Sequence, residues 1–123
     1  RGLLVDPDDP EYKTWYAGGV GGGIWKTTDG GETWAEQTKN LPNIAISWII
    51  MAPSDHSIMY AGTGEGWGGT SGFIKGNGIV KSTDSGNSWT PLLATIENTD
   101  FEIVNRIIVD PANANIEGLT LSY

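Results

Sequence analysis

The hydrophobic residues of this chain fall in short runs, and glycine or proline separates almost all of them. No segment shows the apolar spacing of about 3.6 residues that an amphipathic helix requires. Short apolar runs bounded by turn-forming residues are typical of β-strands. The pattern therefore predicts an all-β chain of short strands joined by tight turns.

The strands recur in a fixed order, which indicates an internal repeat. Three apolar runs end at a proline anchor, namely Val5-Asp6-Pro7, Met51-Ala52-Pro53 and Val109-Asp110-Pro111. The first two anchors are each followed by a Tyr-Ala-Gly run, at residues 16–18 and 60–62. The repeat is about fifty residues long, a length typical of one β-propeller blade.

Each repeat divides into four expected strands. The first strand is a continuous apolar run in each copy, a pattern that predicts burial on both faces. The expected strands are residues 3–5, 15–17, 24–27 and 34–38, then 48–51, 58–61, 79–82 and 89–93, and finally 106–109. The fold class is thus predicted as all-β: a β-propeller fragment of about two four-stranded antiparallel blades plus the start of a third.

The predicted blade boundaries follow from the repeat. Blade one covers residues 1–45, blade two covers residues 46–103, and residues 104–123 begin a third blade. A closed propeller needs about 4 to 8 blades. We therefore expect the remaining blades of a larger chain, or other copies of this one, to complete the ring.

A nine-residue motif occurs once in each full repeat. It reads KTTDGGETW from Lys26 to Trp34 and KSTDSGNSW from Lys81 to Trp89. Both copies resemble the Asp-box of sialidase-type, sortilin-type and related glycoside-hydrolase propellers, which include large secreted bacterial proteins. The residues that fit the Asp-box are Thr27, Asp29, Gly31, Thr33 and Trp34 in one copy, and Ser82, Asp84, Gly86, Ser88 and Trp89 in the other.

Turn chemistry explains each position of the motif. The aspartates, Asp29 and Asp84, can accept hydrogen bonds from turn N–H groups. Gly31 and Gly86 permit a positive φ, and the closing tryptophan can pack on apolar surface. We therefore expect the motif residues to be structural rather than catalytic.

The charge balance excludes one class of partner. Fifteen acidic against seven basic residues give a net charge of −8, so phosphate groups would be repelled and a nucleic-acid partner is not expected. No apolar run approaches the ~20 residues of a membrane-spanning helix.

The chain has a lone histidine, His56, and no cysteine, and its acidic segment DPDDPE reads as a turn rather than a calcium loop. We expect neither a metal site nor a cofactor.

The strand order predicts where a ligand would bind. The motif turns join third and fourth strands at one end of each blade, and the resemblance implies ligand sites at the opposite end, around the central channel. The segment GEGWGGTSGFIKGNG, residues 64–78, lies at that opposite end and is longer than its counterpart at residues 19–23. Its acidic, aromatic and polar side chains suit sugar binding by stacking and hydrogen bonding, although a decorative surface loop is an equally good interpretation. The candidates there are Glu65, Trp67, Lys75 and Asn77.

A second segment, TIENTDFEIVNR, adds acids near the same end. Glycoside hydrolysis uses a pair of carboxyl groups about 5 to 9.5 Å apart, so Glu65, Asp100 and Glu102 are the candidate catalytic residues. Arg106, in the first strand of the third blade, is a candidate ligand-binding residue. A sialidase-like site would need several arginines for a substrate carboxylate. The chain has two, Arg1 and Arg106, which argues against a self-contained sialidase.

Three functions remain open from the sequence. The first is a segment of a secreted glycoside-hydrolase-like or carbohydrate-binding propeller, with a glycan site shared among blades. The second is a non-catalytic propeller for protein recognition or assembly, as the sortilin-type resemblance implies, and the third is a purely architectural propeller domain. The resemblance implies a secreted or cell-surface protein, and any enzymatic activity would be that of a glycoside hydrolase.

Overall fold

The computed structural model describes residues 2–19, 22–41, 45–64, 76, 78–96, 104–113 and 117–121. Within these ranges the chain forms β-strands and one short 3-10 turn, η2 (Leu93–Thr95). None of the described segments is a helix of the length and hydrophobicity needed to cross a membrane.

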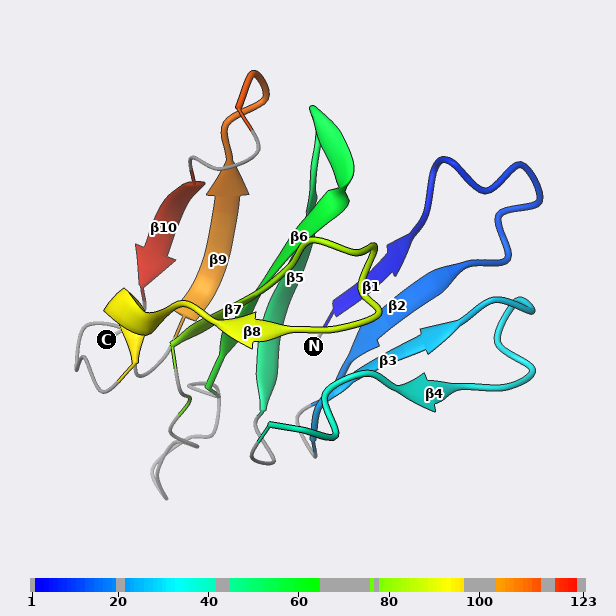
Figure 1. Ribbon diagram of the computed structural model, residues 1–123, viewed down its shortest axis with the longest axis horizontal. Helices are drawn as coiled ribbons and strands as arrows, with labels where there is room; N and C mark the ends of the chain where they lie inside the picture. The colour runs from blue at the N-terminus through cyan, green and yellow to red at the C-terminus, as the bar shows by residue number, and fades with distance from the viewer. Residues whose placement is uncertain are drawn as a thin grey trace.

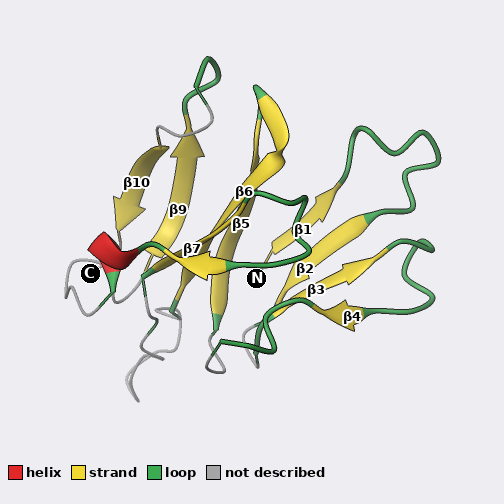
Figure 2. Cartoon of the chain, in the orientation of Figure 1, coloured by secondary structure: helices red, strands yellow, loops and turns green. Residues whose placement is uncertain are grey.

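The strands form two four-stranded sheets and one two-stranded sheet, all antiparallel (Figure 1). In each four-stranded sheet every strand pairs with the next one in the chain, which is the blade order predicted from the repeat. The all-β prediction is confirmed (Figure 2), while the blade boundaries at residues 45 and 103 stay predictions. Blade one contains β1 (Gly2–Val5), β2 (Trp15–Gly18), β3 (Ile24–Thr27) and β4 (Ala35–Glu36); blade two contains β5 (Ile46–Ala52), β6 (Asp55–Thr63), β7 (Ile79–Ser82) and β8 (Thr90–Pro91); β9 (Val104–Val109) and β10 (Glu117–Leu121) begin a third.

The third strands, β3 and β7, have the predicted bounds, whereas the fourth strands are shorter than predicted. The tryptophan that closes each motif stays in the turn, because its indole N–H donates to a turn carbonyl: Trp34 to Gly31, and Trp89 to Gly86, both at 3.1 Å. β8 then ends at Pro91, which has no N–H for further pairing.

The hydrophobic core lies between sheets rather than within one. Tyr16 and Ile24 of blade one pack with apolar residues of blade two, and a second cluster joins blade two to β9. The residues that blade two gives to the first cluster are Ile46, Ile49, Met51, Met59, Ala61, Val80 and Trp89; the second cluster contains Ala52, Tyr60, Ile79, Val104, Ile107 and Val109. Blades therefore stabilise each other by burying apolar surface at every sheet-to-sheet contact.

The glycine of each Tyr-Ala-Gly run lies at a close approach of one sheet to the next. A methyl group on Gly18 would lie 2.3 Å from Cγ2 of Ile46, and one on Gly62 would lie 2.8 Å from Cγ1 of Val104. Both glycines thus make room for the first strand of the following sheet. The repeated glycine is explained by packing, not by an unusual backbone angle.

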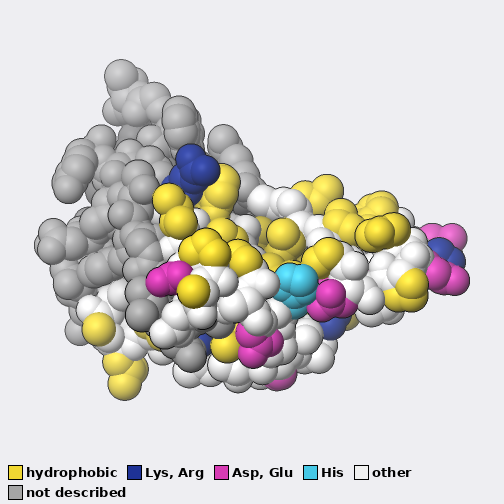
Figure 3. Space-filling view, turned by 90° about the horizontal axis from the view of Figure 1, so that it is seen from above, with side chains coloured by type: hydrophobic (Ala, Val, Ile, Leu, Met, Phe, Trp, Pro, Cys, Tyr) yellow, Lys and Arg dark blue, Asp and Glu magenta, His cyan; other side chains and the backbone are white. Residues whose placement is uncertain are grey.

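The prediction that every first strand is buried on both faces was wrong for β9, where the side chain of Ile108 is 54% exposed, and for β1. Its burial alternates, and the side chains of Leu3 and Val5 are 65% and 41% exposed. In the described part of the chain no sheet covers that face of blade one. The resulting apolar patch includes Leu3, Val5, Trp25 and Trp34. Figure 3 shows hydrophobic side chains gathered over the blade-one end of the molecule.

Candidate functional site

The two motif turns, box one (Thr27–Trp34) and box two (Ser82–Trp89), are held by the same internal hydrogen bonds. In box one, Asp29 Oδ1 accepts from the Thr27 hydroxyl at 2.7 Å and from the Thr33 N–H at 2.9 Å. The Thr27 hydroxyl in turn accepts from the Gly31 N–H at 3.0 Å. In box two, Ser82, Asp84, Gly86 and Ser88 make the equivalent bonds at 2.8, 2.9 and 2.9 Å.

The backbone of both turns contains two consecutive positive φ angles. Gly30 and Gly31 have φ of 74° and 95°, and Ser85 and Gly86 have φ of 59° and 78°. The sequence pointed to the second residue of each pair but not to the first. Ser85 shows that a non-glycine residue is accommodated at the first position, at some cost in backbone strain.

Hydrogen bonding keeps both motif carboxylates ionised. The hydroxyl and N–H of Thr33, followed by the Thr27 hydroxyl, lower the pKa of Asp29 to about 2. For Asp84, partial burial pushes the pKa upward, but the hydrogen bonds from Ser88 and Ser82 outweigh that effect and the pKa is lowered. A carboxylate that stays ionised and is already committed as an acceptor is poorly suited to donate a proton in catalysis. This supports the structural interpretation of the motif.

Box two also makes a polar contact with the neighbouring blade. The carbonyl of Ser85 accepts from the Tyr16 hydroxyl at 2.8 Å and from Lys26 Nζ at 3.1 Å, and Lys26 Nζ donates to Asn87 Oδ1 at 3.0 Å. Burial, then the charge of Asp6, raises the pKa of Tyr16 to about 12. The tyrosine therefore remains protonated as a donor to box two. We call this set of contacts the inter-blade latch.

At the opposite end from the box turns, a threonine closes each blade. Thr38 Oγ1 accepts from the Ile24 N–H at 3.1 Å, and Thr95 Oγ1 accepts from the Ile79 N–H at 3.0 Å. These bonds occupy the first N–H of β3 and β7. They fix the backbone next to the loops that were predicted from the sequence to bind a ligand.

An arginine and a tryptophan meet near that same end, on neighbouring first strands. The guanidinium carbon of Arg106 in β9 lies 5.5 Å from the ring centroid of Trp48 in β5. The indole Nε1 of Trp48 is buried without a hydrogen-bond partner. The hydroxyl of Ser47 donates to the Val104 carbonyl and so ties the two strands together next to this pair. The Arg106 guanidinium is thus held over the Trp48 ring, while the indole N–H of Trp48 faces the interior.

Among the predicted ligand-binding residues, Arg106 is the one that the structure describes. It brings Arg106 against Trp48, which could be recognised in the sequence only as a member of an apolar strand. The other candidates lie outside the described residues: Glu65, Trp67, Lys75, Asn77, Asp100 and Glu102. Their roles stay predictions.

The acidic segment at residues 6–11 forms a turn, in agreement with the sequence interpretation. Asp9 Oδ2 accepts from the N–H groups of Lys13 and Thr14 at 3.0 and 2.9 Å and from the Thr14 hydroxyl at 2.8 Å. Over the parts of the chain that the structure describes, no group of three or more His, Cys, Asp or Glu residues is arranged to hold a metal ion.

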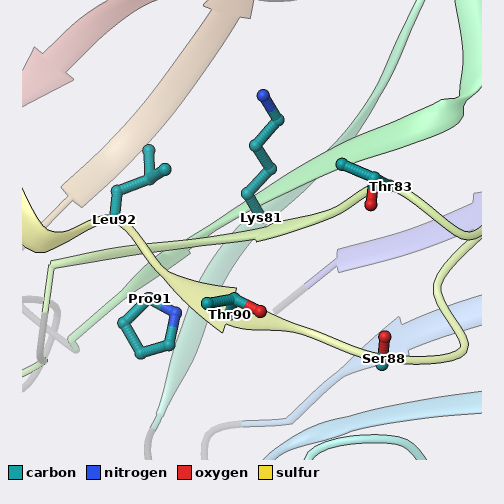
Figure 4. A pocket seen from close by; sticks show the side chains of 6 residues that line it. All are labelled: Lys81, Thr83, Ser88, Thr90, Pro91 and Leu92. Atoms are coloured by element: carbon teal, nitrogen blue, oxygen red, sulfur yellow. The ribbon is translucent and has the colours of Figure 1, made fainter.

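A shallow hollow of about 200 Å³ lies over β7 and β8, on the box side of blade two (Figure 4). Its lining combines polar side chains with a proline and a leucine. The lining residues are Lys81, Thr83, Ser88, Thr90, Pro91 and Leu92.

Comparison with known proteins agrees with this architecture. No protein-family model matches the chain. A xyloglucanase from a Paenibacillus species is 28% identical over 126 residues, which cover 90% of this chain and 11% of the relative. The chain thus spans about a tenth of the length of the curated relative that it matches.

Two solved structures share the fold. An ancestral GH74 enzyme superposes with a TM-score of 0.70 at 20% identity, covering 98% of this chain and 13% of that one. The GH74 enzyme of Niastella koreensis superposes with a TM-score of 0.60 at 24% identity, covering 89% and 15% of the two chains. These likenesses show the fold, and the predicted class, an all-β propeller fragment with two four-stranded blades and the start of a third, is confirmed.

Proposed function

We propose that this chain is part of a glycoside-hydrolase-like propeller, and that it contributes to a glycan site at the end opposite the box turns. The observation that carries the proposal is the Arg106–Trp48 pair, in which the exposed guanidinium of Arg106 lies over an aromatic ring near that end. Glycan hydroxyl oxygens accept from guanidinium N–H groups, and the apolar faces of sugar rings pack on aromatic side chains. The 28% identity to a xyloglucanase supports a glycan as the ligand class.

The proposal keeps the sequence candidates in their predicted roles. Trp67, Lys75 and Asn77 would bind the glycan with Arg106, and two of Glu65, Asp100 and Glu102 would supply the carboxyl pair that glycoside hydrolysis requires. The proposed site is shared among blades, so this chain supplies part of it. The proposal includes the secreted or cell-surface location that the resemblance implies.

The test is a calorimetric titration of the complete propeller that contains this chain with xyloglucan oligosaccharides, with mannan oligosaccharides as the comparison ligand. Arg106→Gln removes the charge and most donors, and Trp48→Phe replaces the indole under the guanidinium with a smaller ring. We expect Arg106→Gln to weaken binding roughly three- to tenfold, as the loss of about 1 kcal/mol of hydrogen bonding implies, and Trp48→Phe to weaken it less. Lys13→Gln, which alters a cation paired with Glu11 far from the site, is the matched control and should bind normally.

The loop candidates need variants of their own. Trp67→Ala should weaken binding by about 1 to 2 kcal/mol through the loss of stacking area. The proposal would be contradicted if the Trp48, Trp67 and Arg106 variants all bound the oligosaccharides as tightly as the original protein does. Capture of a peptide without competition by any oligosaccharide would favour the protein-recognition alternative.

A further inference from the structure

The outer face of blade one is the face that turns away from blade two. Leu3 and Trp25 lie on it together, because both are paired with Ala17 across neighbouring strands, and Val5 follows Leu3 on the same side of β1. All three side chains are exposed. The proline anchors and the box motif align them with three buried residues of blade two that pack against blade one: Met51, Ile49 and Val80. Blade one therefore presents to solvent the surface that blade two buries.

Box two shows what covers a box turn in this chain. Its Ser85 carbonyl accepts from the Tyr16 hydroxyl and from Lys26 Nζ of blade one. Lys26 also donates to the side chain of Asn87. Gly86 lies against the Tyr16 ring, since a methyl group there would stand 2.5 Å from Cε1. A box turn is thus covered by a tyrosine and a lysine of the blade before it.

Box one has matching acceptors without such donors. Gly30 and Glu32 take the motif positions of Ser85 and Asn87. Within the part of the chain that the structure describes, no group donates to the Gly30 carbonyl and no cation pairs with the exposed Glu32 carboxylate. A carboxylate at this position suits a lysine better than an amide does, because a hydrogen bond between opposite charges is stronger.

The strand registers show that the sheets of a second copy do not supply these donors. The Tyr-Ala-Gly runs at residues 16–18 and 60–62 lie on the second strands, and their tyrosines are already buried, by blade two and by β9 respectively. On the third sheet, β10 has Gly118 and Thr120 at the register positions that the tyrosine and the glycine occupy in the blades. Among the described strands, none therefore offers a free tyrosine two residues before a glycine.

We propose that the outer face of blade one is covered by a preceding blade, a four-stranded sheet whose second strand reads Tyr-x-Gly and whose third strand carries a lysine. The tyrosine hydroxyl and the lysine donate to the Gly30 carbonyl, and the lysine pairs with Glu32. This blade stands to blade one as blade one stands to blade two, so the established interface continues in the same direction. The exposed apolar residues of the face then form an inter-blade core: Leu3, Val5, Trp25 and Trp34.

Zero-length cross-linking with a carbodiimide tests the identity of the occupant. The reagent joins a carboxylate to an amine in contact with it, and mass spectrometry of the digest identifies both residues. In the complete propeller that contains this chain, we expect Glu32 to be joined to a lysine that follows a Tyr-x-Gly strand of the same polypeptide. Glu32→Gln should abolish this product. The product that joins Glu11 to Lys13, which are 3.2 Å apart, is the internal control and should remain.

Oxidation by hydroxyl radicals measures whether the face is covered. Trp34 should react faster than its buried counterpart Trp89 in this chain alone, and in the complete propeller its oxidation should fall to the level of Trp89. Leu3→Glu should restore the oxidation of Trp34, since burying an unpaired carboxylate is costly. Thr28→Glu is the matched control and should leave Trp34 protected, because the counterpart Thr83 is exposed although blade one covers box two.

Three results would overturn the proposal. The first is unchanged oxidation of Trp34, or no cross-link of Glu32 to such a lysine, in the complete propeller. The second is a product that joins Glu32 of one molecule to Lys26 or Lys81 of another in an isotope-labelled mixture, which would assign the face to a second copy. The third is protection of Trp34 in this chain alone by a xyloglucan oligosaccharide, to the degree seen in the complete propeller, which would assign the face to a glycan. The first two readouts need no glycan, so they do not depend on the proposed glycan site.

Discussion

The two box turns have nearly the same internal structure but very different surroundings. Each is closed by an aspartate that accepts from a hydroxyl and an N–H two and four residues away, and by an indole that donates to a turn carbonyl. Trp89 of box two is 1% exposed, whereas Trp34 of box one is 38% exposed. The difference arises because blade one covers box two, and no described part of the chain covers the outer face of box one.

This comparison separates two contributions that the motif makes. The hydrogen bonds inside the turn come from the nine-residue motif alone, so both copies have them. The packing of the tryptophan and glycine depends on the neighbouring sheet. Among the described residues, only box two is covered by such a sheet, so only box two is stabilised by this packing in full. The same motif should therefore have unequal effects on stability at its two positions.

The largest difference in unfolding free energy between the two positions is expected for substitutions of the closing tryptophans. Trp89→Ala should lower the free energy of unfolding by about 3 to 5 kcal/mol, since it removes a fully buried ring from the inter-blade core. Trp34→Ala should cost about 1 kcal/mol, because much of that ring is already in contact with water. Urea unfolding followed by circular dichroism measures both, and equal losses would contradict the proposed division.

Substitutions of the glycines in the two turns should differ less in their cost to stability. Both have a positive φ, so Gly31→Ala and Gly86→Ala should each cost about 1 to 2 kcal/mol in backbone strain. At Gly86 the new methyl group would also stand 2.5 Å from the Tyr16 ring, whereas at Gly31 the nearest atom, in Trp15, is 3.1 Å away. Overpacking should add about 1 kcal/mol or more for Gly86→Ala.

Tyr16→Phe offers a check on that difference. If the extra loss at Gly86 comes from contact with the ring of Tyr16, the phenylalanine background should leave it unchanged, because the ring remains. Tyr16→Ala should remove the extra loss. A double-mutant cycle on unfolding free energies gives the coupling directly.

The inter-blade latch should have a smaller effect. Lys26→Met keeps the aliphatic stem but removes the hydrogen bonds to Ser85 and Asn87, and we expect a loss of about 0.5 to 1 kcal/mol because Lys26 is partly exposed. Lys13→Met, which affects an exposed ion pair with Glu11, should leave the unfolding midpoint within error. A Lys26 variant as stable as the original chain would show that apolar packing alone holds box two in place.

Much of the fold could be predicted from the sequence because the signals are local. Short apolar runs, turn residues and the repeated Tyr-Ala-Gly predicted both four-stranded sheets, and β3 and β7 have the predicted bounds. The exposure of Leu3 could not be predicted in the same way, because burial depends on which sheet covers a strand and not on the strand's own residues.

The candidate site was harder to predict for the same physical reason. Arg106 stood out as a rare cation on an inner strand, but its partner, Trp48, was indistinguishable from a core residue until the two strands were placed side by side. The latch was missed because its donors, Tyr16 and Lys26, are 69 and 59 residues from the acceptor Ser85. The repetition of Tyr and Lys at equivalent positions was the available signal.

The smallest difference between the two boxes is expected for the part that they share, the ionised aspartate. The folded-state pKa of Asp29 is about 2, against an ordinary value of 3.8. A carboxylate whose pKa is depressed by folding stabilises the native state fully above its unfolded pKa, and this contribution is lost as the pH falls through the folded pKa. Asp29 should therefore contribute equally at all pH values above about 4 and lose its contribution between about pH 4 and pH 2.

Carbon-detected NMR titration of the aspartate carboxyl groups measures this directly. Thr33→Val removes the hydroxyl that contributes most to the shift, so the pKa of Asp29 should move back toward 3.8 and the acid loss of stability should shrink. Ser88→Ala should act on Asp84 in the same direction, since the Ser88 hydroxyl is the strongest of the hydrogen bonds that lower its pKa. If the titration midpoint of Asp29 stayed near 2 in the valine variant, the N–H groups of the turn would be enough to keep the pKa of Asp29 low. The hydroxyl position of the motif would then be needed for the fold of the turn and not for its electrostatics.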